Sequence, residues 1–466
     1  MFGYTRQVTV AAILVTACAA LVQAASAAEP SGRFAVITDI HFDPFAPEEI
    51  AATLARLPPD EWMARFAALP TAPASQYGKD TNHVLLASAL AAIAQRTADA
   101  DFAIIGGDLL SHGFEEDTAR ALAVPLGSAA QRDFAKRTTL FTTLALGEVF
   151  AGRPVIVALG NNDSDCGDYE IEPGGGYLAA IRDTVRALAG TDRVAADFDE
   201  TFGAGGYYAL RHPTVPDTRI LVVNDILWSE RYRDACGADG LAAGRAEMAW
   251  LSATLDAIAS AGQRAWIVHH IPWGIDPYST LHAKAESCPA RVVPFMGAAF
   301  SDAFLALIRR HAGIIDMSLS GHIHFDDYRL LLDDTGAAAG FDKVVPAISP
   351  IFGQNPAFQL FTYDLADGRP RDFSTIALAN LPALGPAPGD WRETYVFSEA
   401  YGVSGFSPES VAVLWNGLGQ GGARRAAYRD NYNAGHGVLA SAGLEAYACA
   451  VAYLDRADYA ACLCGE

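Results

Sequence analysis

Short apolar runs alternate with amphipathic stretches from residue 34 to about residue 380. The runs are nearly continuous in apolar and β-branched side chains, which is typical of strands buried on both faces. Two stretches, Thr81–Ala98 and about Gly244–Ala261, have helical spacing instead. The predicted strands are Phe34–Thr38, Phe102–Ile105, Arg153–Leu159, Ile220–Val223, Ala265–Val268 and Ile314–Leu319. This alternation predicts an α/β fold whose sheet is covered by helices on both faces.

The pattern changes towards the C-terminus. Tyr328–Leu332 and Phe358–Asp364 look like strands with hairpin-like spacing, which suggests a second sheet or an antiparallel extension. A stretch rich in Pro and Gly, Leu381–Asp390, then interrupts the pattern, and apolar residues recur every three or four positions between Val438 and Tyr459. We therefore expect a main domain over residues 29–385 and a small helical C-terminal unit over residues 386–466.

The first 28 residues have the pattern of a secretory signal peptide. Arg6 precedes an apolar run from Val8 to Val22, and Ala25-Ser26-Ala27 fits a cleavage site. A membrane anchor is the first alternative, but the run is short for a span. A lipoprotein is the second, because Val15-Thr16-Ala17-Cys18 loosely resembles a lipidation box. We expect cleavage and a soluble mature chain that is secreted or periplasmic, with no stable membrane span.

Composition and charge narrow the class of protein. Of 466 residues, 51% are hydrophobic and 19% are charged, which excludes a disordered chain. The formal net charge of −21 would repel polyanions such as duplex DNA and anionic membranes. We therefore expect no nucleic-acid polymer as a partner. A small phosphate ester fits, because a bound metal ion reverses the local field.

The cysteines fit an exported protein. Seven are present, and one of them, Cys18, would leave with the signal peptide. The remaining six favour disulfides over a zinc site, because Cys462 and Cys464 are spaced too closely for the usual pair of zinc ligands. Six cysteines allow 15 pairings, and the residues alone do not choose among them. The six are Cys166, Cys236, Cys288, Cys449, Cys462 and Cys464.

Five polar motifs each follow one of the apolar strands directly. In an open α/β sheet, sites form just outside the carboxyl ends of the strands, so motifs far apart in sequence can meet there. Each motif alone is common, but five in this order and in this position are unusual. The motifs are Asp39-Ile40-His41, Gly106-Gly107-Asp108, Gly160-Asn161-Asn162-Asp163, His269-His270 and Gly321-His322-Ile323-His324.

These residue types suit a centre of two metal ions. Residues at positions i and i+2 of an extended segment point the same way, so Asp39 and His41 can hold one ion together. The carboxylate of Asp108 has two oxygens and can bridge two ions. Mixed His, Asp and Asn ligands suit zinc, iron or manganese. We expect two divalent ions, with zinc as the first choice and iron or manganese as alternatives.

Taken together, the motifs resemble the calcineurin-like metallophosphoesterase superfamily. Gly107-Asp108-Leu109-Leu110-Ser111-His112 and Val268-His269-His270-Ile271-Pro272-Trp273-Gly274 resemble its acid sphingomyelinase-like phosphodiesterase branch more closely. The resemblance implies a sandwich of two β-sheets flanked by helices, an αββα arrangement with the helical C-terminal unit added. It also suggests that Cys236 pairs with Cys288 and that a local bridge forms near the C-terminus, within the region from Cys449 to Cys464.

The resemblance also implies how the ligands are shared. One ion would be held by Asp39, His41, Asp108 and His324, and the other by Asp108, Asn161, His270 and His322. The family usually has His after the ligand Asn, but this chain has Asn162, which can donate a hydrogen bond but cannot act as an acid. We therefore expect His112 to be the general acid and Asn162 to contact a phosphate oxygen.

These residues predict an exported phosphodiesterase with a dinuclear metal site. A hydroxide that bridges the ions would attack phosphorus in a small-molecule diester or pyrophosphate, while His112 protonates the leaving group. A phosphomonoesterase or nucleotidase on the same site is the first alternative, and a non-catalytic metal-binding protein is the second. The sequence leaves the natural substrate and the oligomeric state open.

Overall fold

The structure of the protein is a computed structural model. It describes residue 3, residues 30–233, residue 236, residues 240–437, residue 439 and residues 443–465. The predicted signal peptide lies outside these residues, apart from Gly3. Within the part of the chain that is described, no helix is both long enough and apolar enough to cross a bilayer.

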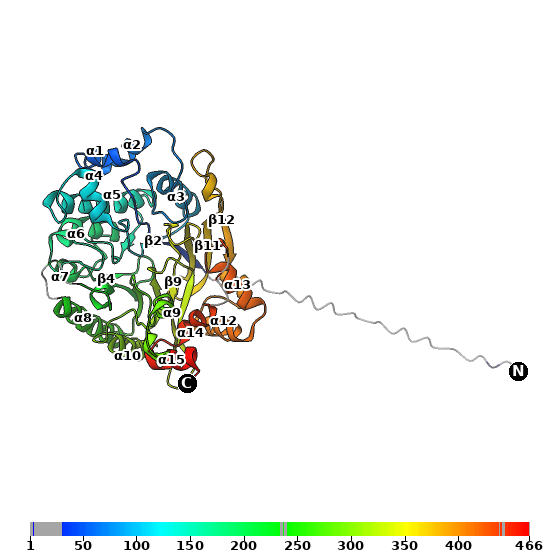
Figure 1. Cartoon of the computed structure of the whole chain (residues 1–466). Helices are drawn as coiled ribbons and strands as arrows, with labels where there is room; N and C mark the ends of the chain where they lie inside the picture. Colours follow the sequence, from blue (N-terminus) through cyan, green and yellow to red (C-terminus); the bar gives the residue numbers. More distant parts are fainter. Residues whose placement is uncertain are drawn as a thin grey trace.

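Two mixed sheets of six strands each form the centre of the molecule (Figure 1). The first has the order β12-β11-β10-β1-β2-β3, and the second has the order β4-β5-β6-β7-β9-β8. In chain order the strands are β1 (Ser31–Ile37), β2 (Phe102–Ile105), β3 (Val155–Val157), β4 (Tyr208–Arg211), β5 (Thr218–Val222), β6 (Arg264–Val268), β7 (Ile315–Ser320), β8 (Asp327–Leu332), β9 (Ala338–Val344), β10 (Ala357–Asp364), β11 (Pro370–Leu378) and β12 (Trp391–Val396).

The strands that carry the predicted site are parallel to one another within each sheet. β1, β2 and β3 run in parallel in the first sheet, and β5, β6 and β7 run in parallel in the second. Every residue of β2 and of β7 is buried, as expected for strands covered on both faces. Since the carboxyl ends of parallel strands lie at one edge of a sheet, each sheet presents its polar motifs at a single edge.

Aromatic side chains fill the space between the sheets. Phe34 of β1 is fully buried, and its ring centroid lies 5.0 Å from Phe102 of β2 and 5.1 Å from Trp266 of β6. The hydroxyl of Tyr208 in β4 donates to the carbonyl of Val157 in β3 at 2.9 Å. These contacts hold the two sheets against each other and so fix the distance between the carboxyl ends of their parallel strands.

Helices cover the outer faces of both sheets (Figure 1). α6 packs on β3, α8 packs on β6, and α12 and α14 pack on β8. The α-helices are α1 (Ala51–Leu54), α2 (Trp62–Ala67), α3 (His83–Arg96), α4 (Phe114–Leu122), α5 (Ala129–Val149), α6 (Gly176–Ala189), α7 (Phe198–Gly205), α8 (Gly240–Ser260), α9 (Pro277–His282), α10 (Ser301–His311), α11 (Phe397–Tyr401), α12 (Pro408–Gln420), α13 (Ala423–Asn431), α14 (Leu444–Ala452) and α15 (Arg456–Cys464). Five short 3₁₀ helices are also present, at Glu48–Ile50, Pro59–Glu61, Asp225–Trp228, Pro289–Arg291 and Leu381–Ala383.

The architecture confirms the predicted α/β sandwich of two sheets with a helical C-terminal region. All six predicted apolar strands are present, and the predicted helices correspond to α3 and α8. The sequence did not reveal β4, β9, β11 and β12. The predicted boundary near residue 385 stays a prediction; β12 lies beyond it and pairs with β11.

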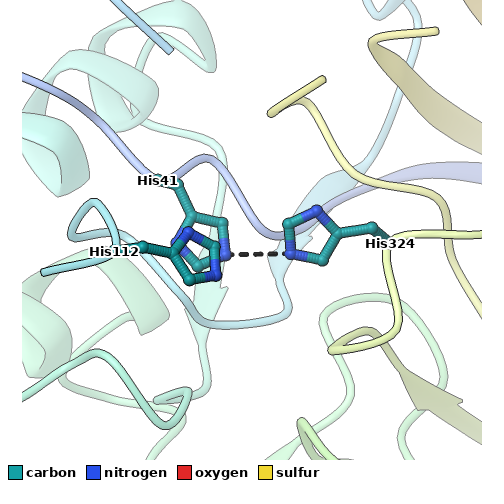
Figure 2. Close-up of side chains that lie close together, drawn as sticks. All are labelled: His41, His112 and His324. Atoms are coloured by element: carbon teal, nitrogen blue, oxygen red, sulfur yellow. Dashed lines mark hydrogen bonds between the residues drawn. The ribbon is translucent and has the colours of Figure 1, made fainter. Parts of the chain in front are cut away.

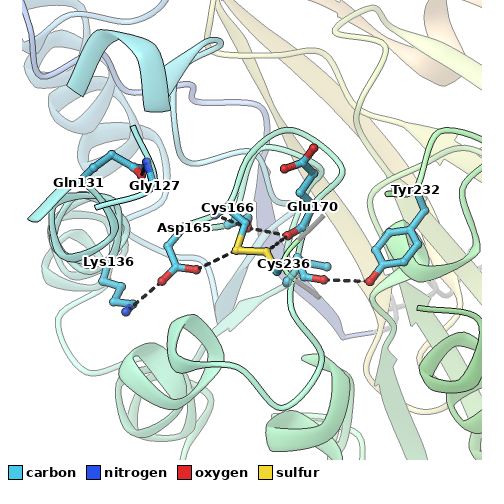
Figure 3. Close-up of a disulfide and its surroundings, with 10 residues drawn as sticks. Gly127, Gln131, Lys136, Asp165, Cys166, Glu170, Tyr232 and Cys236 are labelled. Atoms are coloured by element: carbon cyan, nitrogen blue, oxygen red, sulfur yellow. Dashed lines mark hydrogen bonds and ion pairs between the residues drawn. A yellow bond between two sulfur atoms is a disulfide. The ribbon is translucent and has the colours of Figure 1, made fainter. Parts of the chain in front are cut away.

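The six cysteines form three disulfides, which correct one predicted pairing. The bridges are Cys166–Cys236, Cys288–Cys464 and Cys449–Cys462. The local bridge near the C-terminus is confirmed, but the pairing of Cys236 with Cys288 is wrong. The backbone N–H of Arg233 donates to the carbonyl of Tyr169 in the loop after β3, and Cys166 of that loop is bonded to Cys236 (Figure 3). Cys288 instead lies beside the end of α15.

Candidate metal centre

All seven predicted metal ligands lie just beyond the carboxyl ends of five parallel strands. β1 is followed by Asp39 and His41, β2 by Asp108, β3 by Asn161, β6 by His270, and β7 by His322 and His324. Five of the seven have a positive φ, between 44° and 68°, which is uncommon for residues other than glycine. Such strained backbone persists where the surrounding structure enforces it, and it gathers at functional sites. The five are Asp39, His41, Asp108, His322 and His324.

The carboxylate of Asp108 lies between the two groups of ligands. Its Oδ2 is 3.2 Å from Nε2 of His41 and 3.2 Å from Nε2 of His270. Its Oδ1 accepts a hydrogen bond from the backbone N–H of Asn162 at 2.8 Å, which fixes the orientation of the carboxylate. Asp108 is thus placed where one carboxylate can serve two ions.

One side of Asp108 faces a group of histidines and an aspartate. Nε2 of His41 and Nε2 of His324 lie 3.0 Å apart, and Nε2 of His324 is 3.5 Å from Oδ1 of Asp39 (Figure 2). Asp39, His41 and Asp108 also place one ligand atom each within 4.8 Å of one another. This group matches the first predicted ligand set.

The other side of Asp108 faces the second predicted ligand set. Oδ1 of Asn161 lies 3.1 Å from Nε2 of His270. Asp108, His270 and His322 each offer a ligand atom within 4.8 Å of the other two. The two sets draw on both sheets, because Asn161 and Asp108 follow strands of the first sheet while His270 and His322 follow strands of the second.

Backbone carbonyls fix which ring nitrogen of two histidines is free. Nδ1–H of His41 donates to the carbonyl of Leu110 at 2.8 Å, and Nδ1–H of His270 donates to the carbonyl of Gly106 at 2.8 Å. With Nδ1 engaged in this way, Nε2 faces Asp108 in both residues and is the nitrogen left to bind an ion. Metal-binding histidines commonly have this arrangement.

Burial and the neighbouring charges shift the pKa values of these groups in opposite directions. Burial alone would lower the pKa values of His41 and His270, but the charge of Asp108 raises them to about 9 and about 10. Burial lowers the pKa values of His322 and His324 well below the usual value, and neighbouring histidines lower them further. The carboxylate of Asp108 thus favours positive charge in the centre of the cluster, whereas His322 and His324 remain neutral and able to bind an ion.

A buried atom without a partner indicates that these residues fit metal ions. Nδ1 of His322 is buried and has no hydrogen-bond partner among the described residues. Such atoms are rare in folded proteins, and one in a cluster of carboxylates and imidazoles suits an ion. Oxygen and nitrogen donors on both sides of a shared carboxylate form the donor set that two divalent ions require.

His112 lies at the edge of the first group and is held by an aspartate. Its ring stacks on His41 with centroids 4.0 Å apart, and its side chain is 34% exposed (Figure 2). Nδ1 of His112 lies 3.1 Å from both carboxylate oxygens of Asp80, and Asp80 also accepts the backbone N–H of His112 at 2.8 Å. The other ring nitrogen, Nε2, is therefore free to face a ligand of the site.

Asn162 lies beside the carboxylate of Asp108. Its Nδ2 donates to Oδ2 of Asp108 at 3.2 Å, while its backbone N–H donates to Oδ1. The residue is 6% exposed. In this arrangement Asn162 orients Asp108, and its contact with a phosphate oxygen stays a prediction.

His269 lies in a buried network behind His270. Its two ring nitrogens lie 3.1 Å from carboxylate oxygens of Asp225 and Asp342. Burial lowers the pKa of His269, but Asp342 and then Asp225 raise it to about 10. Asp225 also accepts the backbone N–H groups of His270 and Ile271, so this network holds the backbone that carries His270.

Several residues around the site carry no signal in the sequence. Asp80 lies in the segment between α2 and α3, and Asp168 and Tyr169 lie in an irregular loop after β3. Each is a single polar residue outside any motif, so only the fold reveals that it contacts His112, Asn161 or His322. Tyr169 lies eight residues after Asn161, a spacing that belongs to no motif.

Comparisons with known proteins agree with this geometry. The family described as "Calcineurin-like phosphoesterase" matches residues 32–326, which include all seven predicted ligands. The family described as "Acid sphingomyelin phosphodiesterase C-terminal region" matches residues 341–466.

Three relatives match most of the chain. The human protein named "Acid sphingomyelinase-like phosphodiesterase 3b" is 26% identical over 449 residues, or 94% of this chain and 90% of the relative. The protein named "Cyclic GMP-AMP phosphodiesterase SMPDL3A" from Mus musculus is 25% identical over 82% of this chain and 80% of its own length. "Sphingomyelinase phosphodiesterase C" from Dictyostelium discoideum is 23% identical over 82% of this chain and 80% of its own length.

Proposed function

Because the chain belongs to the calcineurin-like phosphoesterase family of metal-dependent phosphoric ester hydrolases, we propose that it is an exported phosphodiesterase for small molecules. The observation that supports this most directly is the position of Asp108, whose Oδ2 lies 3.2 Å from one histidine of each ligand set. The names of the relatives support cleavage of phosphodiesters rather than monoesters. Pyrophosphate bonds of small molecules belong to the same proposal.

The seven ligands would hold two divalent ions, with zinc before iron or manganese. Asp39, His41, Asp108 and His324 would hold one, and Asp108, Asn161, His270 and His322 the other. When bound, such ions lower the pKa of a shared water and neutralise the charge on the phosphoryl oxygens. The protein contributes by fixing the ligands at rigid strand ends, which keeps the reacting groups in place.

His112 would give a proton to the leaving group. Asp80 holds Nδ1, so Nε2 is left for the substrate, and the partly exposed ring can be reached from outside. General acids of this kind contribute roughly 10²–10⁴-fold to the rate. The contribution is largest when the leaving group is a poor one, such as an alkoxide.

The leaving group would depart past an exposed aromatic ring. Phe352 is 54% exposed, and its ring centroid lies 5.7 Å from His112 and 4.6 Å from His324. A large exposed apolar side chain beside a polar site often contacts a ligand. We therefore expect the enzyme to favour leaving groups with an apolar or planar surface.

A panel of substrates tests the proposal and its alternatives. The purified, metal-analysed protein should hydrolyse bis-p-nitrophenyl phosphate faster than p-nitrophenyl phosphate, and chelation should abolish both activities. Preference for the monoester would instead indicate a phosphomonoesterase or nucleotidase. Two bound ions with no hydrolysis of any phosphoester would indicate a non-catalytic protein.

Variants of His112 test the acid. His112→Ala should keep both ions and lose roughly 10²–10⁴-fold in kcat on an alkyl leaving group, with a smaller loss for p-nitrophenol, which needs no proton. His282→Ala is the matched control, because its side chain is exposed and its Nδ1 is bonded to the carbonyl of Tyr278. A normal rate for His112→Ala on the alkyl substrate would show that another group supplies the proton.

Export rests on the sequence of residues 1–28 and on the three disulfides, since disulfides persist in oxidising compartments. The mature N-terminus, read by mass spectrometry of protein made in its host, should be Ala28 or Glu29, at the end of the predicted signal peptide. An intact N-terminus would contradict cleavage, and a lipid on Cys18 would indicate the lipoprotein.

A further inference from the structure

One short loop contacts predicted metal ligands from both sheets. It follows β3 and contains Asp168 and Tyr169. Oδ1 of Asp168 accepts a hydrogen bond from Nδ2 of Asn161 at 2.7 Å, and the hydroxyl of Tyr169 lies 3.2 Å from Nε2 of His322. Asn161 follows a strand of the first sheet and His322 follows a strand of the second. Both residues belong to the second ligand set.

Asp168 decides which end of the Asn161 amide faces the ion. A side-chain amide has an oxygen that can bind a cation and a nitrogen that cannot. An ionised carboxylate only accepts hydrogen bonds, so Asp168 holds the nitrogen. The oxygen is then turned towards His270, with Oδ1 of Asn161 3.1 Å from its Nε2. Without Asp168 the amide could rotate and point its nitrogen at the ion.

Tyr169 decides which nitrogen of His322 carries the proton. Because Nε2 faces the phenol and Nδ1 is buried without a partner, Nδ1 is the nitrogen left to bind an ion. Binding through Nδ1 requires that the proton be on Nε2, where the phenol oxygen can accept it. A proton on Nδ1 would instead leave a buried donor unpaired.

The loop is anchored at several points, although it has no regular secondary structure. Cys166 is bonded to Cys236, and the carboxylate of Asp165 lies 2.9 Å from Nζ of Lys136 in α5 (Figure 3). Closer to the ligands, the backbone N–H of Tyr169 donates to the carbonyl of Asn161 at 2.9 Å. These anchors hold Asp168 and Tyr169 at fixed distances from the ligands.

We propose that Asp168 and Tyr169 are positioning residues that set the affinity of the second ligand set for its ion. They act through Asn161 and His322 and leave the first ligand set unchanged. The inference rests on the proposed metal centre. Partners of metal ligands change metal affinity roughly 10–100-fold when they are removed, and we expect a loss of that size for each residue.

The test measures ion binding rather than activity. The full mature protein is stripped with a chelator and titrated with Zn²⁺ in competition with a chromophoric chelator. Wild type should bind two ions. Tyr169→Phe and Asp168→Ala should each bind one ion with wild-type affinity and the other roughly 10–100-fold more weakly. Asp168→Asn keeps a side-chain oxygen that can accept from Asn161, so it should restore most of the affinity.

Two controls separate positioning from general damage. Tyr278→Phe removes a hydroxyl from a tyrosine that is 62% exposed and should bind both ions as wild type does. The metal-free form of Tyr169→Phe should unfold in a single cooperative transition, as metal-free wild type does; loss of that transition would attribute the weaker binding to damage and refute the positioning role.

The outcomes distinguish this inference from the function on which it rests. If wild type binds two ions and the variants bind both with unchanged affinity, the positioning role is refuted and the metal centre stands. Equal weakening of both ions also refutes it, because the first ligand set should not respond. If wild type binds no ion, the proposed metal centre itself is refuted.

Discussion

Acid should destabilise the fold through a histidine far from the metal centre. His212 follows β4 and is 4% exposed, with its ring centroid 4.6 Å from Trp266, 5.1 Å from Phe102 and 5.2 Å from Tyr363. Its Nδ1 accepts the backbone N–H of Val215 at 3.1 Å, which requires an unprotonated nitrogen. Burial lowers the pKa of His212 from the usual 6.5 to about 3 in the folded protein.

The direction and size of the effect follow from this difference. Because the folded state holds the proton less tightly than the unfolded state, the stabilising contribution is complete above pH 6.5 and is lost as the pH falls towards 3. At pH 4.5 the unfolded chain is protonated and the folded one is not. Two pH units below 6.5, at about 1.4 kcal/mol per unit, correspond to about 3 kcal/mol of lost stability.

Urea unfolding at pH 7.0 and pH 4.5 measures the stability that depends on unprotonated His212 when wild type is compared with His212→Asn. The asparagine oxygen can accept the same backbone N–H groups but does not titrate. Between the two pH values, wild type should lose about 3 kcal/mol more free energy of unfolding than the variant, because other titrating groups cancel in the comparison. Equal losses would refute a lowered pKa for His212. His282→Asn, at an exposed site, should follow wild type.

Three further substitutions test other parts of the structure. Phe34→Ala removes a fully buried ring from between the sheets and should lower the free energy of unfolding in urea by about 3–5 kcal/mol. Replacing Cys288 and Cys464 with serine opens a bridge between residues 176 positions apart, which corresponds to about 5 kcal/mol in the chain-entropy model and should appear as a lower melting temperature without reductant. Gly107→Ala should reduce the ions retained after dialysis, because Gly107 has a φ of 95° and a Cβ there would lie 2.5 Å from the backbone nitrogen of Gly160.

The predicted site was accessible from the sequence because its residues are local to strand ends. Each of the five motifs follows an apolar run that is a strand in the structure, and the order of strands alone brings the motifs to one region. The position of Asp108 between the two predicted ligand sets is an example, since the strand of Phe102–Ile105 ends three residues before it. The position of a polar motif directly after a strand depends only on a short segment, and the hydrophobic pattern predicts such strands well.

The missed strands depend on contacts that the pattern does not contain. β12 is exposed at three consecutive positions out of six, as an edge strand can be, and so lacks an apolar run. β9 contains the buried charges Asp342 and Lys343, which are paired with His269 and Asp326 from other segments. From the sequence alone, a charged residue is expected to be exposed, because the partner that would allow its burial is not known.

The disulfide pairing, and residues such as Asp80 that contact the predicted site residues, could not be predicted from the sequence for a similar reason. Cys166 pairs with Cys236 because an irregular loop lies against a distant segment, and no spacing rule encodes that contact. Asp80 contacts His112 across 32 positions. Pairings of this kind follow from the folded chain and not from its local pattern.

The predicted ligands come from two sheets that pack against each other through side chains such as Phe34 and Trp266. Asp39, His41, Asp108 and Asn161 move with one sheet, while the three remaining ligands move with the other. A small slide of one layer over the other, too small to unfold the chain, would lengthen several ligand distances at once. The number of ions that remain bound is therefore a more sensitive measure of the packing between the two sheets than the melting temperature. Mutations that change the packing around Trp266 should be screened by metal content first.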